Sequence, residues 1–173
     1  MTKEISIISA GDIVLSDKVV VADPCYSRDE ESIVKDVAVK PGKYATYIVK
    51  NNEGRVASVI AVHEDYIASS KAGWELDDRF IGVDSGQCGI FDNTVYPANG
   101  KSVGEYNDEN SFYGECCKLT LSKANGGILK SRNGVVSSSG YGDGQYKLFY
   151  QYRENELVAL MVDFGLKVNI AIM

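Results

Sequence analysis

The sequence YATYIVKNNEGRVASVIAVHED, residues 44–65, decides the fold of this chain. Polar and apolar side chains alternate from Tyr44 to Ile48, as in a β-strand with one buried face. Residues 51–54 read Asn-Asn-Glu-Gly, which is typical of a hairpin turn. Residues 55–65 then carry mainly apolar side chains on both faces. We therefore expect this second strand to lie centrally in an antiparallel sheet.

Similar strand patterns recur on both sides of this hairpin, separated by turn residues. We expect turns at 10–12 and 16–18 and a sharp strand end at Asp23-Pro24, because proline fixes φ. The expected strands cover 4–23, 37–66, 79–91 (two short ones around 84–86), 128–136, 146–152 and 157–164, and the last three are predicted to be antiparallel neighbours. Residues 166–173 are either another strand or a docked terminus.

Helical patterns are few. Ser111 to Leu121 is the best candidate, although Gly114 weakens it, and Arg28 to Val34 could form one turn after an N-cap at Ser27. We therefore predict a mainly β fold, an antiparallel sandwich or a partly open barrel with one or two short helices. Residues 1–173 are expected to form a single domain.

Composition limits the partners and the compartment. The net charge of −6 argues against nucleic-acid binding, and no apolar run is long enough to span a membrane. The N-terminal residues lack the pattern of a signal peptide, and the four cysteines lack disulfide-framework spacing. We therefore expect a cytoplasmic protein. The oligomeric state cannot be derived from these features.

The most unusual stretch is SSSGYGDGQY, residues 137–146. Its glycines allow positive φ and close approach of a ligand, and successive backbone N–H groups in such turns can bind an anion. It lies within residues 111–153, which hold six basic and two acidic side chains in an otherwise acidic chain. Lys130, Arg132 and Lys147 could supply positive charge. The alternative interpretation is a long hairpin connection whose glycines serve only its geometry.

A short internal similarity points to a second turn. Residues 86–91 and 144–149 share the pattern Gly-Gln-x-x-(Ile/Leu)-Phe, which is either coincidence or a repeated unit that places two turns in related positions. Catalytic alternatives are weaker. A Cys25–His63 pair has no recognisable signature around it, so Cys25 is interpreted as a small buried hydrophobe. No paired cysteine and histidine spacing predicts zinc.

Three motifs together resemble a family of bacterial and phage proteins that is described only as a domain of unknown function. They are Asp23-Pro24-Cys25-Tyr26, the stretch VDSGQCGIFD at 83–92, and SGYGDGQY at 139–146. The resemblance covers roughly residues 19–165. It implies a bacterial or phage cytoplasmic protein and a common surface for the three motifs, and it carries over no activity and no cofactor.

These observations favour a non-enzymatic module that binds a small anionic, nucleotide-like ligand, with sequestration of a host signal or inhibition of a host protein as its role. One alternative is a metal-assisted hydrolase that uses Asp23, Asp84 and Asp143. The other is a protein–protein interaction domain that uses a sheet edge. The predicted ligand-binding residues are Asp23, Tyr26, Asp84, Ser85, Gly86, Gln87, Ser139, Gly140, Tyr141, Gly142, Asp143 and Gly144.

Overall fold

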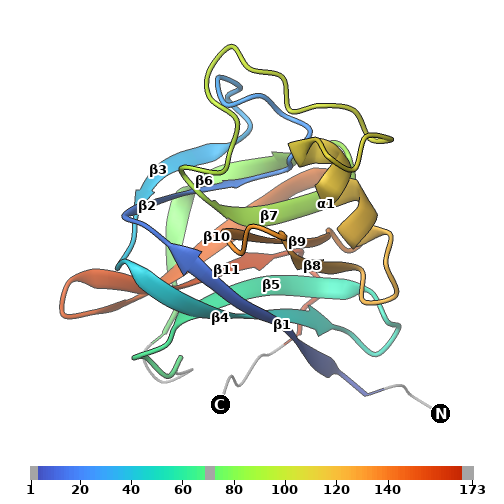
Figure 1. Cartoon of the computed structure of the whole chain (residues 1–173). Helices are drawn as coiled ribbons and strands as arrows, with labels where there is room; N and C mark the ends of the chain where they lie inside the picture. Colours follow the sequence, from blue (N-terminus) through green and yellow to red (C-terminus); the bar gives the residue numbers. More distant parts are fainter. Residues whose placement is uncertain (1–3, 69–72, 169–173) are drawn as a thin grey trace.

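The computed structural model describes residues 4–68 and 73–168, which form two antiparallel sheets and one helix (Figure 1). Sheet A has the order β1-β4-β5-β11-β10-β6, and sheet B has the order β3-β2-β7-β9-β8. The elements are β1 (Ser6–Leu15), β2 (Lys18–Ala22), β3 (Val34–Ala38), β4 (Gly42–Lys50), β5 (Val56–His63), β6 (Glu75–Val83), β7 (Gln87–Asp92), α1 (Phe112–Thr120), β8 (Gly126–Ile128), β9 (Gly134–Ser138), β10 (Gly144–Arg153) and β11 (Glu156–Asp163). The predicted mainly β, antiparallel fold is confirmed, in its sandwich form.

The β4–β5 hairpin forms as predicted. The Asn51 side chain accepts hydrogen bonds from the backbone N–H groups of Glu53 (3.0 Å) and Arg55 (2.9 Å), which fixes the turn. Strand β5 lies between β4 and β11, and all eight of its residues are buried. Its two apolar faces follow from this central position, because one faces sheet B and the other is covered by Tyr66, Ala68, Trp74 and Val168.

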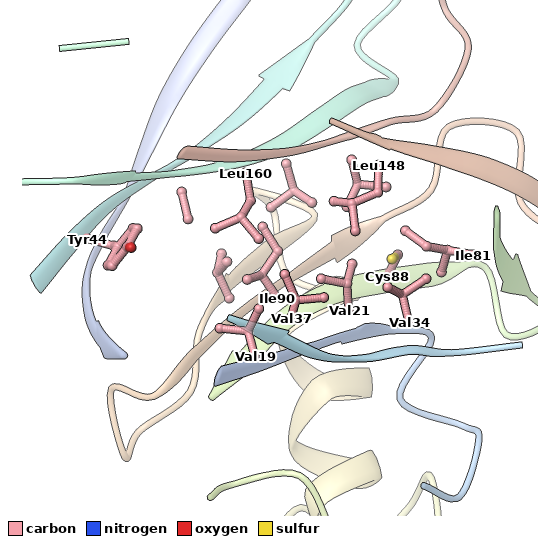
Figure 2. Packing of buried hydrophobic residues seen from close by; sticks show 14 of the residues in the cluster. Val19, Val21, Val34, Val37, Tyr44, Ile81, Cys88, Ile90, Leu148 and Leu160 are labelled. Carbon is pink, nitrogen blue, oxygen red and sulfur yellow. The ribbon is translucent and has the colours of Figure 1, made fainter. Parts of the chain in front are cut away.

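The main core lies between the two sheets. Figure 2 shows Leu148 and Leu160 of sheet A facing Val19, Val21 and Ile90 of sheet B. All five side chains are buried. Burial of such side chains contributes roughly 1.5–3 kcal/mol each, so this layer dominates the stability of the sandwich.

Helix α1 covers the outer face of sheet B and forms a second core there (Figure 1). The Ser111 hydroxyl caps it by accepting a hydrogen bond from the N–H of Gly114 (3.0 Å), which confirms the predicted start. Gly114 is required by packing, since a Cβ there would lie 1.8 Å from the carbonyl oxygen of Asp108. In the described part of the chain, no helix is long and apolar enough to cross a membrane.

The helical turn predicted at Arg28–Val34 is wrong. Ser27 donates to the Asp29 carboxylate (2.6 Å) instead of capping a helix. The Arg28 guanidinium makes four hydrogen bonds to the loop at 93–97. This long-range anchoring outweighs the weak local helix preference, and residues 28–33 form turns that lead into β3.

Two other strand predictions need correction. Residues 128–136 are not one strand, because Leu129 and Gly134 close a turn that separates β8 from β9, and Arg132 adopts φ 62° in it. Residues 10–12 are not a turn but a bulge within β1. The tail shows no strand at 166–168, and residues 169–173 lie outside the described part.

The stretch 139–143 joins the two sheets. We expected it to link antiparallel neighbours, but β9 belongs to sheet B and β10 to sheet A. The turn at 84–86 makes the same kind of crossing, from β6 in sheet A to β7 in sheet B. Since β6 pairs with β10 and β7 pairs with β9, the two crossovers lie side by side at one end of the sandwich.

Candidate functional site

Asp23 ties two of the motif turns together. Its carboxylate is fully buried at the end of β2. One oxygen, Oδ1, accepts from the Cys25 N–H (2.9 Å) and the Ser85 hydroxyl (2.5 Å). The other, Oδ2, accepts from the backbone N–H groups of Asp84 (2.8 Å) and Ser85 (2.6 Å). All four hydrogen bonds are internal, so this carboxylate acts as a clamp between the 23–26 and 84–87 turns.

The third motif turn contacts the second through the backbone. The N–H of Ser139 donates to the carbonyl of Gly86 at 3.1 Å. Gly86 and Gly140 adopt φ of 72° and 69°, a region that favours glycine. The three motif stretches are therefore neighbours in space. The two Gly-Gln units begin strands of different sheets from adjacent crossovers.

Several predicted ligand groups in the 139–144 loop are used within the loop. The Ser139 hydroxyl donates to the Gly142 carbonyl at 2.9 Å. The Tyr146 hydroxyl donates to the same carbonyl at 2.6 Å and lies 3.1 Å from the carbonyl oxygen of Ser139. Asp143 and Gly144 are exposed beside them. These hydrogen bonds within the loop hold its conformation without a ligand.

Tyr141 projects from this loop and is 67% exposed. The guanidinium carbon of Arg55 lies 4.2 Å from its ring centroid, and its hydroxyl donates to the Glu53 carboxylate at 3.3 Å. One ring face is therefore occupied by the β4–β5 hairpin. Lys130 and Arg132, which we expected to supply charge, lie in the β8–β9 turn, at the far end of β9 from this loop. The cation that contacts Tyr141 is Arg55, which was not among the expected residues.

Gln87 and Tyr26 lie inward of the turns. Gln87 is buried; its amide nitrogen donates to the Cys117 sulfur at 3.4 Å, and its amide oxygen has no hydrogen-bond partner among the described residues. Tyr26 is half-buried, and its carbonyl accepts from the Tyr96 hydroxyl at 2.6 Å. Both residues therefore contact the protein interior.

This geometry gives little support to the two catalytic alternatives, a metal-assisted hydrolase and a Cys–His pair. Asp84 and Asp143 are exposed whereas Asp23 is buried, and the described residues contain no group of three or more acidic, cysteine or histidine side chains suited to hold a metal ion. Burial and the neighbouring Asp23 raise the pKa of the Cys25 thiol to about 12, which makes it a poor nucleophile. Both ring nitrogens of His63 are engaged, with Pro41 and Asp65.

A cleft of about 740 Å³ opens elsewhere, along the side of the sandwich where β3 ends sheet B and β6 ends sheet A. Its buried wall includes Val37 and Leu157, and its rim includes Leu76 and Tyr152, which are 55% and 46% exposed. No residue of the three motif turns lines this cleft or four smaller ones of 250 to 440 Å³.

A bulge in β6 shapes this cleft. The pairing of β6 with β10 shifts between Phe80 and Leu76, and the irregularity turns Asp77 inward. Asp77 accepts hydrogen bonds from Arg79 (2.9 Å) and from the Tyr150 hydroxyl (2.5 Å). Burial raises the pKa of this carboxyl, but the hydrogen bonds and the charge of Arg79 outweigh burial and lower the pKa to about 2. Asp77 is therefore ionised and paired.

No sequence pattern predicts this cleft. Its walls come from three distant segments, 36–40, 75–79 and 150–157. The available signal is the charged run Glu75-Leu76-Asp77-Asp78-Arg79, which interrupts the strand alternation. Such an interruption indicates a bulge, although it does not say what faces it.

The fold and these turns define an antiparallel two-sheet domain in which a buried aspartate ties the β6–β7 crossover to the turn after β2. Residues 13–162 match the family described as "Protein of unknown function (DUF4241)", and the chain belongs to that family. This confirms the expected membership in a domain family of unknown function, while the match does not single out the three motifs. It spans the motif turns and both walls of the cleft. No curated protein and no solved structure matches the chain.

Proposed function

We propose that this domain is a non-enzymatic binding module that docks a segment of a partner protein in the cleft between β3 and β6. The observation that carries the proposal is the position of the cleft between the end strands of both sheets, with Leu76 and Tyr152 exposed at its rim. Large apolar side chains on the wall of a cleft are typical anchors for a docked chain.

The partner is held mainly through side chains in this proposal. A regular edge strand would accept an added strand along its whole length. Here the bulge at 77–79 interrupts β6, and Asp36 adopts φ 58° within β3. Bulges of this kind protect sheet edges from uncontrolled pairing. A side-chain docking surface therefore fits these edges better than a continuous ladder.

The role of the module follows from its expected origin. In a bacterium or phage, docking without catalysis would inhibit or sequester the partner. Its four cysteines are free thiols, which is consistent with the proposed location in the reducing cytoplasm.

Selection of random peptides displayed on phage tests the proposal. Peptides selected on the intact protein are measured against a cleft variant, Leu76→Ala with Tyr152→Ala. The matched control is Leu121→Ala with Tyr106→Ala, whose side chains are 86% and 71% exposed in other segments. We expect the cleft variant to bind about thirtyfold more weakly, because an apolar anchor is typically worth more than about 1 kcal/mol. Peptides that bind both variants equally would refute the proposal.

A small anionic, nucleotide-like ligand at the motif turns is a second candidate. The observation that favours it is the adjacency of the three turns, with the Arg55 guanidinium against Tyr141 and 3.5 Å from the Gly140 carbonyl. Titration with ATP, GTP and a cyclic dinucleotide, followed by amide NMR, tests it. Shifts confined to the amides of Gly86, Gly140 and Gly142 would support it, and unchanged spectra would eliminate it.

A further inference from the structure

The charges around the β3–β6 cleft define the kind of segment that fits it. Five acidic and two basic residues line the cleft. One of the two basic residues, Arg79, is already paired with Asp77 at 2.9 Å. From this imbalance we infer that the docked segment is basic, an extended stretch in which an arginine or lysine lies next to an apolar residue; the inference rests on the proposed docking function.

The acidic groups that meet the segment are on the β6 rim. Asp77 is not one of them, because Arg79 and Tyr150 already occupy its carboxylate. Glu75 and Asp78 are exposed on either side of it, and neither forms an ion pair within the described part of the chain. On the other side of the cleft, Asp36 and Glu156 add two more carboxylates. Lys40 is the remaining basic side chain of the lining, and these four carboxylates outnumber it, so a docked cation is attracted overall.

Arg79 narrows the cleft. Its guanidinium donates to the Asp77 carboxylate and also lies 3.5 Å from the carbonyl oxygen of Lys35 in β3. This bridge spans the two sheet edges, and the hydrogen bond from Gly82 N–H to the Ser32 carbonyl (2.9 Å) joins them further along. The open part of the cleft therefore starts beyond Arg79, beside Leu76 and Tyr152.

Tyr152 gives arginine an advantage over lysine. It is 46% exposed at the cleft, and its ring centroid lies 6.2 Å from that of Tyr150 at an interplanar angle of 72°. A guanidinium can stack on a tyrosine face while its N–H groups bind a carboxylate, whereas an ammonium offers only a point charge. Leu76, between Glu75 and Asp77 in the chain, provides the apolar contact for the neighbouring residue.

Three synthetic peptides test the inference. They share the same apolar residues at alternate positions and carry arginine, glutamine or glutamate at the others. Binding is measured by fluorescence polarisation with the whole protein. We expect the arginine peptide to bind best and to weaken at high salt, because exposed charge pairs are screened.

Charge-removing variants show whether the attraction is local. The cleft variant is Glu75→Gln with Asp78→Asn. The matched control, Asp84→Asn with Asp143→Asn, removes two exposed carboxylates at the motif turns. We expect the cleft variant to bind the arginine peptide about tenfold more weakly and the control less than about twofold, since each exposed pair contributes modestly. All four side chains are exposed, so thermal midpoints should stay close to that of the unmodified protein.

The outcomes separate the inference from the function on which it rests. If the control weakens binding as much as the cleft variant, the attraction is to the overall net charge of −6 and the inference is overturned. If the glutamine peptide binds as well as the arginine peptide and still depends on Leu76 and Tyr152, docking stands but the basic partner is wrong. If no peptide depends on Leu76 and Tyr152, both fail.

Discussion

Replacing Asp23 by asparagine should strongly destabilise the protein. The best arrangement of the new amide turns its oxygen to the backbone N–H groups of Asp84 and Ser85. Its NH₂ group then faces the N–H of Cys25, which loses its acceptor, while the Ser85 hydroxyl can rotate to accept. One unpaired buried donor costs about 1–3 kcal/mol, and two charge-assisted bonds become neutral at about 1 kcal/mol each. We expect a loss of about 3–5 kcal/mol.

Urea unfolding followed by circular dichroism measures this loss, with the slope of the free energy against urea checked to be unchanged. The control is Asp84→Asn, whose exposed side chain should change the unfolding free energy by no more than about 0.5 kcal/mol. Amide hydrogen exchange of Asp84 and Ser85 should accelerate in the Asp23 variant. A loss below about 1 kcal/mol would show that the carboxylate is not the clamp between the turns.

Three further results are expected. The pKa of Asp77 is lowered from 3.8 to about 2 in the folded protein. Its contribution to the free energy of unfolding is therefore complete above about pH 4 and is lost as the pH falls to about 2. The unfolding free energy of Asp77→Asn, measured against pH, should lack this dependence. Alkylation of the half-buried Cys25 at neutral pH, followed by mass spectrometry, should be about a hundredfold or more slower than that of a free thiol, since its pKa is about 12. An ordinary rate would contradict this raised pKa. Gly114→Ala should lower the unfolding free energy by more than about 2 kcal/mol, because the new Cβ meets the Asp108 carbonyl; equal stability with Leu121→Ala would argue against that contact.

Local patterns predicted the elements well where the cause is local. The turn at 51–54 and the helix that begins after Ser111 are set by side chains that bind nearby backbone, and both appear at the expected residues. The apolar side chains on both faces of 55–65 also predicted a central strand, which the structure has at 56–63. Such patterns do not say to which sheet a strand belongs, so the expectation that 128–136 and 146–152 are neighbours is wrong.

The site depends on contacts that no local pattern contains. The sequence marked Asp23 and the two glycine turns as unusual, and they do lie together. It could not show that the Asp23 carboxylate would be filled by internal donors. The cleft lies where β3 and β6, which are far apart in the chain, form the edges of the two sheets on the same side of the sandwich. Only the folded chain shows that these edges are neighbours.

The most direct test of the docking cleft is an amide NMR titration of the intact protein with a selected peptide. The cleft predicts that resonances at 36–40 and 75–79 shift, while those at 84–87 and 139–144 remain unchanged. The opposite pattern, with shifts at the motif turns and none along β3 and β6, would contradict the proposal and place the binding surface at the sheet crossovers.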